Sequence, residues 1–272
     1  MAHSTHALRY GSEAHYLDAR LYDHTYARRK DDVRFYVETA DALGGPVLEL
    51  GAGSGRVSVA LARAGHEVVA VDRMPSMLER LRDRLGRERA EVRARVTPRR
   101  GDLKTLRLNR RFPLVISPFN VFMHLYTRAD VEAALATCLA HLTPRGRLVF
   151  DVLNPDLRAF VRDPSRAYVA RPIFDPTTGA RWAYSEQFQY DAATQVQMVT
   201  SVLRHPEDPA EMRVLPLAHR QFYPAELEAL LHYNGFAIES RWGDFSRGPL
   251  DVDAHSQVVV ARALPRRARA AR

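Results

Sequence analysis

The sequence predicts an α/β fold in which a doubly wound, mainly parallel sheet carries an antiparallel insertion. From residue 46 onward, short apolar runs alternate with amphipathic stretches, which is typical of β-α-β units. After residue 155 the apolar period changes to two, which is typical of antiparallel strands. We therefore expect a seven-stranded sheet, an inserted β segment and a helical N-terminus.

The 272 residues have the composition of a globular protein and suffice for one large domain. We predict a single domain made of a helical lid (1–45), a core (46–155 and 223–264) and the β insertion (156–222), with a disordered tail at 265–272. The apolar runs fall short of the roughly 20 residues that span a bilayer, and the polar N-terminus lacks a secretory signal. We therefore expect a cytoplasmic protein outside the membrane.

The net charge of +8 raises the question of an acidic partner such as nucleic acid. Of the 40 basic residues only Lys30 and Lys104 are lysines, and the arginines are interspersed with acids rather than gathered beside aromatic residues. This pattern indicates a bias in base composition and disfavours nucleic acid as a partner. The single cysteine, Cys138, excludes an intramolecular disulfide and a multi-cysteine metal site, and we predict no bound metal.

The core elements are predicted in alternating order. The expected strands are 47–50, 67–72, 96–101, 114–117 and 148–152, followed by a terminal pair at 236–242 and 256–261. The expected helices are 57–64, one opened by Pro75, 131–142, and 225–233, which Asn234 and Gly235 end. A turn at 143–146 precedes the fifth strand.

The flanking segments differ in pattern from the core. Residues 17–43 have a helical period and are rich in tyrosine. In the insertion, the alternation over 182–190 and 196–202 predicts a hairpin with its turn at 191–194, and 214–222 predicts a third strand.

A glycine-rich loop, ELGAGSG at 49–55, follows the first expected strand. Glycine has no Cβ, so the backbone can approach a ligand closely. A dinucleotide loop is one interpretation, because Asp72 lies 21 residues beyond Gly51, where a ribose-binding acid belongs. However, Arg56 stands where that pattern needs a glycine or alanine, and Glu49 would place a carboxylate beside phosphate. A cationic ligand without phosphates fits this loop better.

These segments resemble the motifs of the class I S-adenosylmethionine-dependent methyltransferase family. Residues 49–55 resemble its first motif, VAVD at 69–72 resembles the second, whose acid holds the ribose hydroxyls, and GDL at 101–103 resembles its adenine-binding turn. Residues 142–148 are similar to its turn into the fifth strand, and the terminal pair fits its reversed last strand.

The resemblance implies a Rossmann-like methyltransferase fold with S-adenosylmethionine as cofactor. It implies that Asp102 accepts from the adenine amino group and that the Leu103 amide meets a ring nitrogen. The predicted cofactor-binding residues are Tyr22, Tyr26, Glu49, Gly51, Ala52, Gly53, Asp72, Arg73, Met77, Asp102, Leu103 and Phe119.

Methyl transfer requires alignment of the reacting groups more than it requires a general base, so catalytic residues are hard to identify from the sequence. Classes of methyltransferase are easier to exclude. Cys138 lies in an expected helix and suits buried packing rather than the nucleophilic role that pyrimidine C5 methylation needs. The loop SPFN at 117–120 departs from the Asp/Asn-Pro-Pro-aromatic pattern of enzymes that methylate adenine or glutamine amides. Ser117 stands where metal-dependent catechol-type enzymes carry an acid, and Asp151 with Asn154 is a poor magnesium site.

His124 is the candidate catalytic residue, because it follows the loop that lines the acceptor side in this family and an imidazole can take a proton from a hydroxyl or ammonium. The alternative is a histidine that hydrogen-bonds the backbone at a helix start. The stretch 22–26 (YDHTY) resembles the lid helix of small-molecule N-methyltransferases, the alternative being a helix that packs on the sheet.

The hairpin has an aromatic face, which is a candidate acceptor surface or homodimer interface, formed by Trp182, Tyr184 and Tyr190. The predicted substrate-binding residues are Asn120, His124, Tyr184, Arg220 and Tyr223.

The sequence thus predicts an enzyme that transfers a methyl group from S-adenosylmethionine to a nitrogen or oxygen of a small molecule, such as an amino sugar or a natural-product hydroxyl. The layout resembles that of sugar and glycine-type N-methyltransferases. The alternatives are an RNA or peptide methyltransferase that uses the arginine-rich helix between Arg73 and Arg100, and a non-catalytic regulatory module that binds the nucleoside. An oxidoreductase is disfavoured by Glu49 and Arg56.

Overall fold

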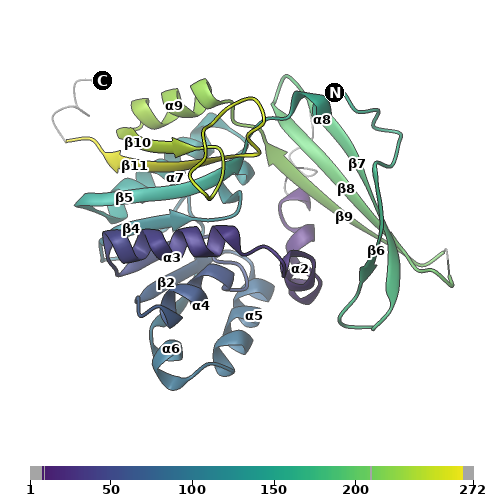
Figure 1. Cartoon of the computed structure of the whole chain (residues 1–272), viewed down its shortest axis with the longest axis horizontal. Coiled ribbons are helices and arrows are strands. Elements are labelled where there is room, and N and C mark those ends of the chain that lie inside the picture. The colour runs from purple at the N-terminus through teal and green to yellow at the C-terminus, as the bar shows by residue number, and fades with distance from the viewer. Residues whose placement is uncertain (1–7, 9, 209, 266–272) are drawn as a thin grey trace. The chain divides into compact units, whose positions relative to one another are not determined.

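The computed structural model describes residues 8, 10–208 and 210–265, and Figure 1 shows its elements. The chain divides into two compact units. We call Arg29–Asn154 with Phe222–Arg272 the core unit, and Met1–Arg28 with Pro155–Gln221 the insertion unit. The predicted lid, residues 1–45, is therefore divided between the two units. The predicted tail lies outside the described residues from 266 onward.

The core unit contains a seven-stranded sheet in the order β10-β11-β5-β4-β1-β2-β3. Strands β1 to β5 run parallel, whereas β11 pairs antiparallel with both β5 and β10. The predicted fold class and the reversed last strand are confirmed. The bounds are β1 Val47–Leu50, β2 Val68–Asp72, β3 Val96–Arg100, β4 Phe112–Ser117, β5 Leu142–Leu153, β10 Phe236–Trp242 and β11 Ser256–Ala263.

The turn predicted at 143–146 is wrong as a separate element, because β5 begins directly after the preceding helix. The pairing of β4 with β5 passes from Phe112–Leu142 to Leu114–Arg147, so the extra residues form an irregularity inside the strand. Pro144 and Gly146 look like turn residues in sequence, but a bulge uses the same residue types.

Helices follow the core strands as the amphipathic pattern predicts. In α5 the residues at helical spacing, Met77, Leu78, Leu81 and Leu85, are buried. Helix α7 begins before the predicted position because Thr127 and Asp130 form a capping box. The bounds are α3 Asp31–Leu43, α4 Arg56–Arg63, α5 Pro75–Gly86, α6 Ala90–Ala94, η2 Val121–His124, α7 Arg128–His141 and α9 Pro224–Tyr233.

The single helix predicted for residues 17–43 is wrong, because the segment forms α2 (Ala19–Tyr26) and α3. Asp18 starts α2 by accepting from the amides of Arg20 and Leu21 at 3.1 and 2.9 Å. Helix α3 starts afresh with Asp31 and Asp32, acids that suit the positive end of a helix. Apolar period alone does not reveal such a restart.

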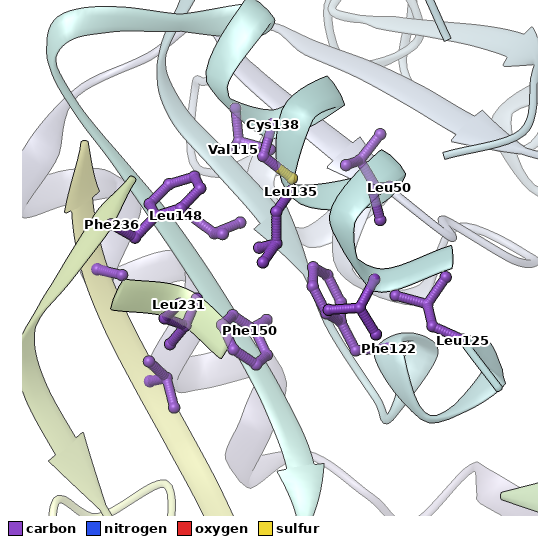
Figure 2. Packing of buried hydrophobic residues seen from close by; sticks show 14 of the residues in the cluster. Leu50, Val115, Phe122, Leu125, Leu135, Cys138, Leu148, Phe150, Leu231 and Phe236 are labelled. Atoms are coloured by element: carbon purple, nitrogen blue, oxygen red, sulfur yellow. The ribbon is translucent and has the colours of Figure 1, made fainter. Parts of the chain in front are cut away.

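Two buried apolar clusters belong to the core unit. Figure 2 shows part of one, in which residues of β4, β5, α7 and α9 meet. Phe122 stacks on Phe150 with ring centroids 4.5 Å apart, and this contact ties η2 to β5. The second cluster contains Phe35 and Tyr36 of α3 with residues of α4 and α5. The strand ends are thus held by packed helices.

The insertion unit contains a four-stranded antiparallel sheet in the order β6-β7-β8-β9. The β7–β8 hairpin and the third strand agree with the predicted positions, whereas β6 and the short α8 were not predicted. Their bounds are η1 Ala14–Tyr16, α8 Leu157–Phe160, β6 Val169–Phe174, β7 Arg181–Asp191, β8 Val196–Arg204 and β9 Met212–Arg220. Within the described residues, no helix is long and apolar enough to cross a membrane.

Candidate functional site

The loop between β1 and α4 holds three glycines in left-handed conformations, with φ of +75°, +54° and +80° at Gly51, Gly53 and Gly55. A Cβ on Gly51 would overlap the side chain of Val121, and one on Gly55 would overlap that of Leu81. Around Gly53, by contrast, the described residues leave a Cβ in open space. Gly53 is therefore a position at which the described residues leave the backbone of this loop uncovered.

Asp72 ends β2 and is tied to the glycine loop. Its Oδ2 accepts from the Gly53 amide at 2.7 Å, and its Oδ1 accepts from the Met74 amide at 2.8 Å. Burial raises the pKa of this carboxyl, and the bonds from Met74 and Gly53 act in the opposite direction. Each carboxylate oxygen can accept a second hydrogen bond, so Asp72 suits a pair of ribose hydroxyls.

Glu49 lies in β1 under the loop, buried, and accepts a hydrogen bond from Ser58 Oγ in α4. Burial raises the pKa of Glu49 to about 8, although the bond from Ser58 and the charge of Arg56 lower it. Burial thus favours the protonated form of this carboxyl in the structure without a ligand. A cationic ligand would favour its ionised form.

Asp102 follows β3 in a compact turn. Its Oδ1 accepts from the Lys104 amide at 2.8 Å, and its carbonyl accepts from the Thr105 and Leu106 amides at 3.0 and 2.8 Å. Leu103 packs against the buried cluster. This arrangement leaves the second oxygen of Asp102 outside the turn's own hydrogen bonds.

The parallel order β1-β2-β3 brings these groups to one edge of the sheet, because each follows the carboxyl end of its strand. Open backbone at Gly53, paired acceptors at Asp72 and a further carboxyl at Asp102 fit an uncharged nucleoside. A cationic group beside Glu49 would lower the pKa of its carboxyl, whose proton would then pass to solvent. The residues present thus fit S-adenosylmethionine.

The remaining predicted cofactor residues of the core unit are placed differently. Ala52 is buried and its amide donates to the Val71 carbonyl at 2.9 Å, which fixes the start of the loop. Arg73 follows Asp72 and is half-buried. Met77 is 1% exposed, so it acts as packing for α5 in this structure. A cofactor contact by Met77 stays a prediction.

The loop after β4 is held in an unusual conformation by Asp151 of β5. Phe119 and Asn120 have φ of +65° and +64°, a region that residues with side chains rarely adopt. The buried carboxyl of Asp151 accepts from their amides at 2.8 and 3.2 Å and from the Tyr36 hydroxyl at 2.7 Å. Burial raises the pKa of Asp151, and the bonds from Tyr36 and Phe119 oppose the rise. Asp151 is thus a positioning residue for this loop.

An ion pair with a buried carboxylate and a half-buried guanidinium supports the same loop. Arg56 of α4 donates to both oxygens of Asp32 in α3, at 2.7 and 2.6 Å. The guanidinium carbons of Arg29 and Arg56 lie 4.6 and 5.2 Å from the Phe119 ring centroid. Arg56, which disfavours a dinucleotide pattern in the sequence, therefore joins α3, α4 and the loop.

Sequence reasoning missed Asp32, Tyr36 and Asp151 as supports of the loop. A signal existed for α3, because Asp32 falls on the apolar stripe that Phe35 and Tyr36 share. An acid on a buried stripe requires a partner. The apolar pattern does not, however, predict that this partner is Arg56.

His124 ends η2 beside this loop and is half-buried. Its Nδ1 lies 3.3 Å from the hydroxyl of Tyr126. His124 and Tyr126 are two residues apart in the chain, so this contact is local. The catalytic role of His124 and the substrate-binding role of Asn120 stay predictions.

In the insertion unit, the predicted tyrosines form an internal cluster around His15. Tyr26 Oη lies 3.0 Å from His15 Nε2, and the Tyr22 ring lies 4.8 Å from the Tyr26 ring. Tyr184 is buried, donates to Glu186, and lies 3.0 Å from Ser201 Oγ. A cavity of about 20 Å³ is lined by His15, Tyr22 and Tyr184 among others. This is space for about one water.

The aromatic face predicted on the hairpin is largely internal. Trp182 is 1% exposed and packs with Tyr184 and with Leu21 of α2. Tyr190 stacks on Phe160 of α8 with centroids 4.1 Å apart. The face is covered because the N-terminal segment of the same unit packs on it. Trp182 is therefore core, whereas the dimer interface stays a prediction.

Arg220 and Tyr223 fall in different units, at the end of β9 and at the N-cap of α9 respectively. Arg220 is buried and Tyr223 half-buried. Cys138 is fully buried, and burial raises its pKa to about 12, which suits packing rather than nucleophilic chemistry. Among the described residues, no group of three or more His, Cys, Asp or Glu could hold a metal ion.

Comparisons with known proteins agree with this geometry. Residues 47–146 match the methyltransferase domain family. The cypemycin N-terminal methyltransferase of a Streptomyces species is 34% identical over 113 residues, which are 41% of this chain and 43% of that protein. The matched segment thus spans less than half of the curated relative.

Solved structures resemble the chain over most of its length. The CcbJ methyltransferase from Streptomyces caelestis has a TM-score of 0.78 and 26% identity, covering 94% of this chain and 99% of that one. The glycopeptide N-methyltransferase MtfA, complexed with S-adenosylmethionine, has a TM-score of 0.60 and 25% identity, with 87% and 94% coverage. Residues 47–146 thus match a methyltransferase domain, and over most of its length the chain is similar to solved methyltransferases, one of them complexed with S-adenosylmethionine.

Proposed function

We propose that this protein transfers a methyl group from S-adenosylmethionine to a nitrogen of a small natural-product or amino-sugar acceptor, with oxygen as the alternative acceptor atom. The observation that carries the proposal is the glycine loop at Gly53, joined by hydrogen bond to Asp72 at the edge of the parallel sheet. Nitrogen is favoured because both MtfA and the cypemycin enzyme are described as methylating nitrogen or an N-terminus.

The bound cofactor supplies an electrophilic methyl group on a sulfonium leaving group. In our proposal Asp72 would accept from the ribose hydroxyls and Asp102 from the adenine amino group, and the nearby cation would favour the ionised form of Glu49, whose proton would pass to solvent. Displacement depends on the alignment of acceptor, methyl group and sulfur. We therefore propose that the Phe119–Asn120 loop, which Asp151 holds, keeps the acceptor side rigid. His124 would take the proton that a nitrogen acceptor releases.

A second candidate acceptor is the amino terminus of a peptide, because the curated relative is an N-terminal methyltransferase. Substrate-binding roles for Asn120, Tyr184, Arg220 and Tyr223 are part of the proposal for either acceptor. We also propose that the two units act together as one methyltransferase domain and that the protein is cytoplasmic.

Calorimetry of the full chain with S-adenosylmethionine, S-adenosylhomocysteine and NAD tests the cofactor. Tight binding of the first two supports the proposal, and preference for NAD overturns it. Incubation with methyl-labelled cofactor and panels of amino sugars, hydroxyl compounds, peptides and RNA then tests the acceptor. Labelling of RNA alone, or binding of cofactor with no labelled product from any panel, contradicts a small-molecule enzyme.

Replacement of His124 by asparagine tests its role. We expect turnover to fall by on the order of 10²-fold, with unchanged affinity for S-adenosylmethionine, because proton transfer by a positioned side chain contributes roughly that much. Tyr126→Phe is the matched control, since it removes the neighbouring hydroxyl but keeps the imidazole. Unchanged turnover in His124→Asn would show that the imidazole has no part in proton transfer.

A further inference from the structure

The segment 101–111, which joins β3 to β4, contains the turn at Asp102 and forms neither helix nor strand. β3 is the outermost strand of the core sheet, so within the described chain no further strand flanks this segment. A segment without regular structure at the edge of a sheet needs other contacts to keep one conformation. In the core unit, helix α7 supplies these contacts.

His141, the last residue of α7, binds the segment through its imidazole and is 1% exposed. Its Nε2 lies 2.8 Å from the Leu108 amide nitrogen, and its Nδ1 lies 2.8 Å from the Thr137 carbonyl oxygen. An amide N–H only donates and a carbonyl only accepts, so the ring carries a proton on Nδ1 and accepts at Nε2. Both ring nitrogens are thus used, in a single tautomer.

Thr137 lies one helical turn before His141 and is fully buried. Its hydroxyl donates to the Lys104 carbonyl at 3.2 Å and accepts from Arg107 at 3.1 Å. Asp130, seven residues before Thr137 and therefore on the same face of α7, accepts from Lys104 Nζ at 3.0 Å. One face of α7 thus binds the segment at several points.

The residues that α7 holds are the same ones that shape the turn at Asp102. Oδ1 of Asp102 accepts from the Lys104 amide, and its carbonyl accepts from the Leu106 amide, both at 2.8 Å. Lys104 is therefore bonded on one side to Asp102 and on the other to Thr137. A shift of the segment away from α7 would turn the Asp102 carboxyl with it.

We propose that His141 and Thr137 are positioning residues, which hold the Asp102 carboxyl in the orientation that selects an adenine base. The inference rests on the proposed function, in which Asp102 accepts from the adenine amino group of the cofactor. Neither side chain touches the cofactor in this proposal, and both act through the hydrogen bonds to residues 104–108.

Calorimetry of the full chain with S-adenosylhomocysteine and S-inosylhomocysteine tests the proposal. The inosyl analogue has a carbonyl in place of the adenine amino group, so it presents an acceptor where Asp102 needs a donor. We expect the analogue to bind the wild type at least about 10-fold more weakly, because a site built for a donor rejects a ligand that lacks it.

His141→Asn keeps a donor for the Thr137 carbonyl but is too short to accept from Leu108. The ratio of the two dissociation constants should fall to about threefold or less. Thr137→Val removes the hydroxyl at nearly constant shape and should lower the ratio in the same way. Partial unfolding weakens both ligands alike, so the ratio reports the orientation of Asp102 and not the stability of the variant.

Two further variants serve as controls. His141→Gln places an amide oxygen within reach of the Leu108 amide, so its ratio should stay within about threefold of wild type. Cys138→Ala removes buried packing from the same helix but none of these hydrogen bonds, so it should lower the thermal stability and leave the ratio unchanged.

Hydrogen exchange over residues 101–111, measured without ligand, tests the anchoring itself. Exchange should quicken in His141→Asn and not in Cys138→Ala. Unchanged exchange in His141→Asn would show that α7 does not hold the segment.

Other results would also overturn the proposal. These are a wild-type ratio near one, an unchanged ratio in His141→Asn or Thr137→Val, and a fall in His141→Gln or Cys138→Ala as large as that in His141→Asn. A failure of the proposed methyltransferase function would look different. The wild type would then bind neither S-adenosylmethionine nor S-adenosylhomocysteine, while hydrogen exchange would still respond to His141→Asn.

Discussion

The two units treat their buried polar groups differently. In the core unit Asp72 and Asp151 are buried, and backbone amides at the edge of the sheet donate to both. In the insertion unit His15 Nδ1 and Trp182 Nε1 are buried, with no hydrogen-bond partner in the described part of the chain. An unpartnered buried group costs about 1–3 kcal/mol unless water or a ligand supplies the partner. Unpartnered buried atoms also occur in the core unit, at Asn154 Oδ1 and Gln257 Oε1, so the units differ in which groups are buried: acids bound by backbone amides in the core unit, and the histidines His15 and His219, whose pKa burial lowers, in the insertion unit.

Acid should reveal the largest difference between the units. Burial lowers the pKa of His15 to about 4, and burial with the charge of His15 lowers that of His219 to about 3. Between about pH 6.5 and 4 the unfolded chain binds protons that the folded unit does not, so stability is full above pH 6.5 and falls as pH falls. The loss is about 1.4 kcal/mol per pH unit for each histidine at most.

The two tryptophans report this difference, because Trp182 belongs to the insertion unit and Trp242 to the core unit. Urea unfolding of Trp242→Phe between pH 7.5 and 4.5 follows Trp182 alone, and Trp182→Phe follows Trp242. The midpoint reported by Trp182 should fall more steeply with acid, and His15→Gln should reduce that slope. If the unfolding midpoints reported by Trp182 and Trp242 fell equally with acid, the two units would not differ in acid stability.

Asp72→Ala should have the largest effect on cofactor binding. The affinity for S-adenosylmethionine should fall about 100-fold, or about 2.7 kcal/mol, because bonds to a charged acceptor and the support of Gly53 are lost together. Calorimetry measures it, with thermal unfolding as the check on folding. Asp72→Asn keeps the shape and should lose less. An affinity within threefold of wild type in Asp72→Ala would contradict our assignment of the ribose site.

Asp151→Asn should separate the positioning of the Phe119–Asn120 loop from the binding of the cofactor. The amide cannot accept from all three donors as the carboxylate does, so the Phe119–Asn120 loop should relax and turnover fall by on the order of 10- to 100-fold. Affinity for the cofactor should stay within about threefold, which steady-state kinetics and calorimetry together would show.

Tyr36→Phe is the graded control for Asp151→Asn, because it removes one of the three donors to Asp151 and leaves both loop amides in place. Its turnover should lie between those of the wild type and Asp151→Asn. If Asp151→Asn lost cofactor affinity as strongly as turnover, the loop would belong to the cofactor site instead.

Tyr184→Phe should have the smallest effect. It removes the hydrogen bonds to Glu186 and Ser201, which should lower the free energy of unfolding by about 1 kcal/mol without changing cofactor affinity. If Tyr184 also binds the acceptor, the acceptor KM should rise while kcat changes little. Ser201→Ala is the control, since it breaks one of the same contacts but keeps the hydroxyl of Tyr184. An unchanged KM in both variants would assign Tyr184 to the core of its unit.

Sequence patterns were most informative where structure is local. The strands, the amphipathic α5 and the hairpin each follow from a period in neighbouring residues, and the glycine loop follows from a backbone requirement. The continuous helix at 17–43 and the turn at 143–146 were wrong for a common reason. Each depends on where a segment restarts or bulges, and capping side chains and the pairing with a neighbouring strand decide that.

By itself the sequence determined the fold class, most strands of the core sheet and the glycine loop after the first of them, because short-range periods and a few steric requirements specify them. Tertiary structure alone decided the strand order, the raised pKa of Glu49, the bonds of Asp151 to the loop after β4 and the pairing of Arg56 with Asp32. Those properties arise from burial and from contacts between residues far apart in the chain, and neither is encoded in any local pattern.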